Sequence, residues 1–169
     1  MDTNLSISQI HLALRNSGIW NKRSDIMIPN LSWGLLDYEA DFVVLSKSGY
    51  LTEVEIKRSW EDFKADFNKK HKHDADQVYY FYYCVPEKIY DKVISFIQLK
   101  SSDNININLP AVIYYTESGN IVRTGFGNPY SRGKHRKLFL EEQLIIARLG
   151  QLRYWNLLEK GGEQWEKRY

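Results

Sequence analysis

The stretch that decides the fold is Glu39–Lys57, which reads EADFVVLSKSGYLTEVEIK. It contains two runs rich in β-branched and aromatic residues, Ala40–Leu45 and Leu51–Lys57. Between them lies the polar segment Ser46-Lys47-Ser48-Gly49, which ends in the glycine that short hairpin loops favour. The stretch therefore predicts a β-hairpin.

One face of this hairpin is predicted to be charged. Side chains alternate between the two faces of a strand, so one face carries acids from both strands and one lysine: Glu39, Asp41, Glu53, Glu55 and Lys57. The opposite face is apolar and is the expected core face. On a single strand such acids would indicate a solvated surface, but acids on two adjacent strands repel one another unless a cation lies among them. Hard oxygen ligands of this kind suit Mg²⁺ or Mn²⁺ better than zinc.

An acid on one strand and a (D/E)-x-K tripeptide on the next resemble the signature of the PD-(D/E)XK nuclease superfamily. Here the lone acid is Asp41 and the tripeptide is Glu55-Ile56-Lys57. The resemblance implies that Asp41, Glu55 and the backbone carbonyl of Ile56 ligate Mg²⁺ or Mn²⁺. It also implies that Lys57 orients the attacking water or helps to deprotonate it, as in metal-dependent hydrolysis of DNA phosphodiesters.

The elements around the hairpin extend this resemblance. Helical spacing and a Ser6–Gln9 capping box predict a first helix at Ser6–Asn16. A short strand at Asp25–Pro29, a helix opening at Ser59 and a buried strand at Val78–Val85 complete the order αβββαβ. This is the order of the restriction-endonuclease-like core, an α/β fold with a mixed central sheet, and it covers about residues 6–85. The segments ADFVVL, EVEIKRS, DFKAD and YYCVP also resemble the MmcB-like branch of DNA-repair nucleases.

The remaining residues, about 86–169, are predicted to extend the same single domain of residues 1–169. A helix is expected at Tyr90–Lys100 and an extra hairpin at Ala111–Tyr115 and Asn120–Phe126. The segment Gly133–Glu159 is helical by its pattern, and Gly161-Gly162 is expected to end it.

Further site residues follow from the same reasoning. Glu39, Glu53 and Gln9 are candidates for supporting the metal ligands, although an acid can simply face solvent and Gln9 can simply cap its helix. Members of the superfamily often carry a glutamate on the first helix, and the absence of an acid in Ile7–Asn16 puts a second metal ion in doubt. Candidate DNA contacts are the cations Lys69, Lys70, Arg132, Lys134, Arg136 and Lys137. The last four lie near an expected helix start, where a positive charge is unfavourable unless it binds phosphate; a solvated turn is the alternative.

Composition limits the remaining possibilities. The single cysteine, Cys84, excludes an internal disulfide and a multi-cysteine zinc site, and its apolar surroundings predict a buried thiol. The net charge of +2 means that nucleic-acid affinity must come from a local patch. No membrane span or leader is legible, which favours a cytoplasmic protein.

The sequence thus predicts a DNA nuclease of repair, recombination or mobile-element DNA handling, in which Lys57→Ala or Glu55→Gln abolishes cleavage and leaves the fold largely intact. A non-catalytic DNA-binding or structural module on the same scaffold is the main alternative. An RNA substrate and a homodimer also stay open.

Overall fold

The described part of the chain forms a six-stranded mixed sheet. The structure is a computed structural model that describes residues 2–31, 34–67, 75–102, 110–129 and 136–165. The strands are β1 (Ile26–Leu31), β2 (Ala40–Leu45), β3 (Leu51–Ile56), β4 (Val78–Pro86), β5 (Ala111–Tyr115) and β6 (Ile121–Arg123). They lie side by side in sequence order, with β3, β4 and β5 parallel and the other neighbours antiparallel.

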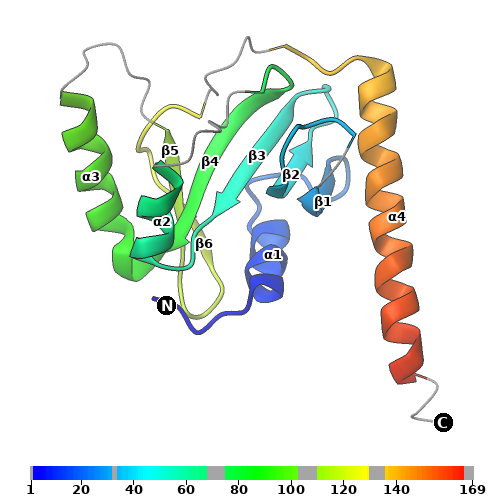
Figure 1. Cartoon of the computed structure of the whole chain (residues 1–169), viewed down its shortest axis with the longest axis horizontal. Helices are drawn as coiled ribbons and strands as arrows, with labels where there is room; N and C mark the ends of the chain where they lie inside the picture. The colour runs from blue at the N-terminus through cyan, green and yellow to red at the C-terminus, as the bar shows by residue number, and fades with distance from the viewer. Residues whose placement is uncertain (1, 32–33, 68–74, 103–109, 130–135, 166–169) are drawn as a thin grey trace.

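Four α-helices accompany this sheet in the described residues (Figure 1). They are α1 (Ile7–Asn16), α2 (Trp60–Phe67), α3 (Tyr90–Ser102), which follows the short helix η1 (Glu87–Ile89), and α4 (Leu140–Trp165). None of the described helices combines the length and the apolar sequence that a bilayer crossing requires.

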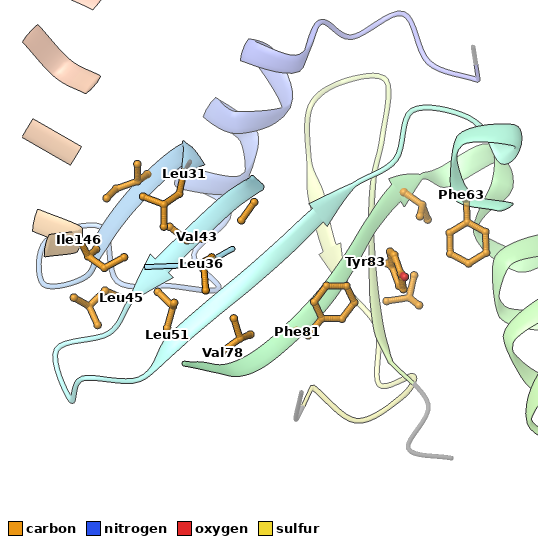
Figure 2. Packing of buried hydrophobic residues seen from close by; sticks show 14 of the residues in the cluster. Leu31, Leu36, Val43, Leu45, Leu51, Phe63, Val78, Phe81, Tyr83 and Ile146 are labelled. Carbon is orange, nitrogen blue, oxygen red and sulfur yellow. The ribbon is translucent and has the colours of Figure 1, made fainter. Parts of the chain in front are cut away.

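Both faces of the sheet are packed, which corrects the expectation of a single core face. Phe42, Val44, Val54 and Ile56 form the predicted apolar face, and they pack with Ile10 and Leu14 of α1. The opposite face was expected to be charged, yet its Val43, Leu45 and Leu51 join a second core with residues of α2, α3 and α4 (Figure 2). As a result every residue of β3 is buried, its two glutamates included.

The hairpin and the crossover that follows it have the predicted form. Ser46 N–H donates to the Tyr50 carbonyl at 2.9 Å, and Gly49 closes the loop with a φ of +86°. The chain then crosses through α2 to β4, which lies parallel to β3 as a βαβ connection requires. The aromatic strand β4 is central and mostly buried, as predicted, because parallel neighbours flank it on both sides.

The edges of the sheet differ from its centre. β1 is an edge strand that contains Pro29, a residue without a backbone N–H. Ile28 of β1 packs against Gly150 of α4, where an added Cβ would lie only 2.9 Å from the Ile28 side chain. The other edge strand, β6, has only three residues and is shorter than predicted.

Helix boundaries were predicted well at the N-terminus and poorly at the C-terminus. The capping box of α1 is present, with Ser6 and Gln9 bonded to each other's backbone N–H. The last helix begins at Leu140, later than the predicted Gly133, and it continues through Gly161-Gly162 to Trp165. Glycine therefore does not end this helix, although it is an unfavourable residue within one.

Two glycines with similar φ angles, the half-buried Gly119 and the exposed Gly127, allow a test of the packing near β5. Gly127 has a φ of +77°, and a Cβ there would clash with the Pro110 carbonyl group and lie 2.9 Å from the Ala111 Cα. Gly119 has a φ of +79°, and no atom lies within 4 Å of an added Cβ. We expect Gly119→Ala to cost about 1 kcal/mol and Gly127→Ala roughly 1–3 kcal/mol more, measured by urea unfolding. Equal costs would show that the Gly127–Pro110 contact relaxes freely.

Candidate active site

The predicted site lies where β2 and β3 stop pairing. Their ladder ends at the pair Phe42 and Val54, although both strands continue. Asp41 and Glu55 occupy the next positions on the two strands. The N–H of Ile56, no longer needed by the ladder, donates to Asp41 Oδ2 at 2.8 Å. This bond ties the lone acid of β2 to the middle residue of the Glu55-Ile56-Lys57 tripeptide.

Lys57 is the centre of a buried ionic network. Its Nζ donates to Glu55 Oε1 at 2.6 Å and to Asp66 Oδ1 of α2 at 2.9 Å. The side chains of these three residues are 3%, 7% and 1% exposed. The other oxygen of Asp66, Oδ2, accepts a hydrogen bond from the Tyr83 hydroxyl at 2.7 Å. The network thus joins β3, α2 and β4.

The backbone of Lys57 is fixed as well. Its N–H donates to the Cys84 carbonyl of β4 at 2.9 Å, and its carbonyl accepts from the Tyr115 hydroxyl of β5 at 3.1 Å. The Lys57 side chain therefore leaves a backbone that two neighbouring strands hold in place.

The charge state of Lys57 follows from this environment. Burial alone would lower the pKa of the ammonium, but the adjacent carboxylates of Glu55 and Asp66 outweigh it and raise the pKa above its usual value. Lys57 is therefore protonated at neutral pH. It acts as a fixed positive charge and as a hydrogen-bond donor.

Asp41 is half-buried, and for its carboxyl group the effect of burial on the pKa outweighs that of the neighbouring hydrogen bond and positive charge. Burial raises its pKa, and the Ile56 N–H and the Lys57 charge offset this only in part. The nearby charges of Asp62 and Glu53 raise the pKa further. An ionised Asp41 is therefore held at a cost in stability.

Three other elements meet at the backbone of Asp41. The His11 ring of α1 stacks on Phe42 with ring centroids 5.8 Å apart. Burial lowers the pKa of His11, and the positive charge of Arg153 lowers it further. A hydrogen bond between His11 and the Asp41 backbone acts in the opposite direction. In the amide orientation that satisfies its neighbours, Asn30 donates to the Asp41 carbonyl at 3.3 Å and accepts from Arg153 Nη2 of α4 at 2.9 Å. Helices α1 and α4 and strand β1 thus position this acid.

The supporting candidates are placed differently from one another. Glu53 is fully buried, and its Oε2 accepts from the Tyr38 hydroxyl at 2.6 Å. Glu39 is exposed to solvent. Gln9 is also exposed and its side chain serves the capping box of α1, so the structure does not bring it to the tripeptide.

Most of the predicted DNA-binding cations lie outside the described residues, namely Lys69, Lys70, Arg132 and Lys134. Arg136 and Lys137 are described, and they precede α4. Both guanidinium nitrogens of Arg136 donate to Glu142 at 2.6 Å, and the guanidinium lies 4.7 Å from the centre of the Phe139 ring. The predicted conflict between Arg136 and the helix dipole is therefore relieved by an acid in the first turn of α4. Lys137 is exposed, with its Nζ 5.1 Å from the centre of the Tyr50 ring.

Sequence reasoning missed Asp66, Tyr83 and Tyr38 as partners of the predicted site. Asp66 is a charged residue of the short helix α2, yet it is only 6% exposed. A signal was present, since Asp66 comes three residues after Phe63 and so borders the apolar face of α2. Cys84 is buried as predicted, and burial raises the pKa of its thiol.

The donor set suits Mg²⁺ in its chemistry. Carboxylates at Asp41 and Glu55 and a backbone carbonyl at Ile56 are hard oxygen donors, and protein-bound Mg²⁺ commonly uses one or two carboxylates together with water. In the described ranges, no group of three or more histidine, cysteine, aspartate or glutamate side chains gathers closely enough to hold a metal ion. A magnesium site here stays a prediction.

Comparison with known proteins provides information about the fold and not about the function. No protein-family model and no curated protein matches the sequence. Among solved structures, the chain is similar to a protein of unknown function from Silicibacter pomeroyi, with a TM-score of 0.55 and 11% sequence identity. The similarity covers 92% of this chain and 91% of that one. The chain thus has a mixed α/β fold that another protein shares along most of its length.

The buried network gives Lys57 a structural role in addition to its predicted catalytic one, so we expect its replacement to lower stability as well as activity. Replacing Lys57 by Met leaves two buried carboxylates without their cation, and we expect this to lower the free energy of unfolding by about 3–5 kcal/mol. Lys64→Met is the matched control, because Lys64 pairs with Glu61 on the surface of α2. We expect the control to change stability by less than about 0.5 kcal/mol in urea unfolding. A similarly small change for Lys57→Met would contradict the ionic network.

The raised pKa of Asp41 predicts a pH-dependent gain from Asp41→Asn. At a pH above the raised pKa, the ionised and partly buried Asp41 carboxylate destabilises the folded wild type. Asparagine carries no charge, and its side-chain oxygen can still accept the hydrogen bond from Ile56 N–H. We expect the variant to be more stable by about 1 kcal/mol at pH 8, or roughly 2–4 °C in Tm. The gain shrinks as the pH falls, because the folded wild type takes up a proton there before the unfolded chain does. Thermal unfolding of both proteins from pH 4 to pH 8, with the exposed Asp37→Asn as control, checks this; a gain independent of pH would refute it.

Proposed function

We propose that the protein is a metal-dependent deoxyribonuclease with a restriction-endonuclease-like core. The observation that carries the proposal is the arrangement at the end of the β2–β3 ladder, where Asp41 and Glu55 occupy adjacent positions and Lys57 Nζ lies 2.6 Å from Glu55. The order α1-β1-β2-β3-α2-β4 supports it, because the PD-(D/E)XK core has the same order and carries its catalytic residues on the second and third strands.

The residues divide the chemistry as follows. Asp41, Glu55 and the Ile56 carbonyl would hold Mg²⁺ or Mn²⁺, which when bound polarises the scissile phosphate and acidifies water. Lys57 would supply a positive charge beside the phosphate. Since the pKa of Lys57 is raised, its role is that of an ammonium and not of the base that removes a proton from water. Asp66 and Tyr83 would hold the ammonium in place.

Glu55→Gln is the sharpest test of activity. Asp66 still pairs with Lys57 in this variant, so the network keeps one of its two acids. We expect the wild type to cleave single-stranded, duplex or branched DNA with Mg²⁺ or Mn²⁺ and to lose activity in EDTA. Removing one ligand should lower the rate by about 100-fold or more. Glu61→Gln, an exposed acid on α2, should retain full activity.

Calorimetric titration with Mn²⁺ separates a lost metal site from a lost fold. Saturable binding by the wild type that disappears in an Asp41→Asn, Glu55→Gln double variant of unchanged circular dichroism would support the proposal. Equal cleavage by the wild type and Glu55→Gln would refute it.

A second candidate is a non-catalytic DNA-binding or structural module. The observation that favours it is the pairing of Lys57, whose buried ammonium is already bound to two carboxylates at 2.6 and 2.9 Å. This candidate gives DNA binding that weakens with salt and is unchanged by Mg²⁺ or by Glu55→Gln. Fluorescence anisotropy with labelled DNA, at several salt concentrations and with or without Mg²⁺, tells the two candidates apart.

A further inference from the structure

The second half of α4 carries a large apolar surface that is exposed among the described residues. From Gln151 to Glu159 every residue except Arg153 is exposed. Five large residues within this short segment are 45–58% exposed: Leu152, Tyr154, Trp155, Leu157 and Leu158. In Figure 1 this part of α4 extends beyond α1, away from the sheet. Exposed apolar surface of this extent marks an interaction site.

The helix contacts its own chain with a different face. Ile146 is fully buried in the core, and Gly150 packs against Ile28 of β1. At 100° per residue, the positions Ile145, Arg148, Leu152, Trp155 and Glu159 form another stripe, centred roughly 160° away around the helix. All five residues of this stripe are exposed. Their spacing of three, four, three and four residues is that of a helix–helix seam.

The charges on the stripe favour pairing with a second copy of α4 in the antiparallel direction. Leu152 and Trp155 have the same midpoint in the sequence as Arg148 and Glu159, between Arg153 and Tyr154. Two antiparallel copies crossing at that midpoint place Leu152 opposite Trp155 and Arg148 opposite Glu159. A parallel pair would instead place arginine against arginine and glutamate against glutamate, which is unfavourable.

From this self-complementary stripe we propose that α4 is a dimerisation helix that pairs antiparallel with α4 of a second copy of this chain. The seam is isologous, as a two-fold dimer requires, and contains two Arg148–Glu159 ion pairs around a centre of Leu152 and Trp155. The apolar centre provides the affinity and the ion pairs determine the direction. The proposal is independent of the nuclease activity, since no residue of the seam belongs to the candidate site.

Charge reversal in the full chain tests the seam directly. Sedimentation equilibrium should show a concentration-dependent monomer–dimer equilibrium for the wild type. We expect Arg148→Glu and Glu159→Arg each to raise the dissociation constant about tenfold or more, because like charges then meet across the dimer. The double variant Arg148→Glu, Glu159→Arg should return to within about threefold of the wild type, since both ion pairs are restored with reversed sign.

Two controls complete the experiment. Lys47→Glu reverses an exposed charge in the hairpin loop and should not change the dissociation constant. Circular dichroism should confirm that each variant is folded. A wild type that remains monomeric at about 100 μM would overturn the proposal, because a specific homodimer is expected to have a dissociation constant below that concentration. A dimer whose double variant stays as weak as the single variants would overturn it as well.

Discussion

The docking of helix α2 on the sheet depends on one buried cation, the ammonium group of Lys57. The Lys57 ammonium satisfies two carboxylates that come from different elements, Glu55 on β3 and Asp66 on α2. Neither acid would tolerate so little solvent without it, since an isolated buried charge is very costly. The cation therefore fixes where α2 docks on the sheet. Apolar packing alone would leave that position less defined, because hydrophobic contacts are not directional.

The apolar contacts around the network support the same docking position. Phe63 of α2 lies edge-on to Tyr83 with centroids 5.3 Å apart, and it also contacts Phe96 of α3. Tyr83 serves both systems, since its ring packs on Phe63 while its hydroxyl donates to Asp66. The crossover between β3 and β4 is thus held by a polar and an apolar interaction that share one side chain. A shift of α2 would break both together.

The hairpin, the capping box and the buried strand β4 could be predicted because each depends on local pattern. Side chains alternate between the two faces of a strand, so the sequence alone predicted that Asp41, Glu55 and Lys57 lie on the same face of the hairpin. The pattern could not reveal that the charged face is covered, because α2 reaches that face only through tertiary packing. For the same reason Asp66 was missed, although it borders the apolar side of its helix. The start of α4 was predicted too early in the sequence because the basic, polar residues before Leu140 are also compatible with a helix.

The edges of the sheet restrict how other polypeptides can join this protein. Unpaired strand edges invite intermolecular strand addition, which leads to aggregation. Here Pro29 removes a donor from β1, α4 packs against the same strand, and β6 at the far edge has only three residues. Both borders of the sheet are therefore poor templates for an incoming strand. Association with another polypeptide is therefore expected to use side-chain contacts and not an added strand.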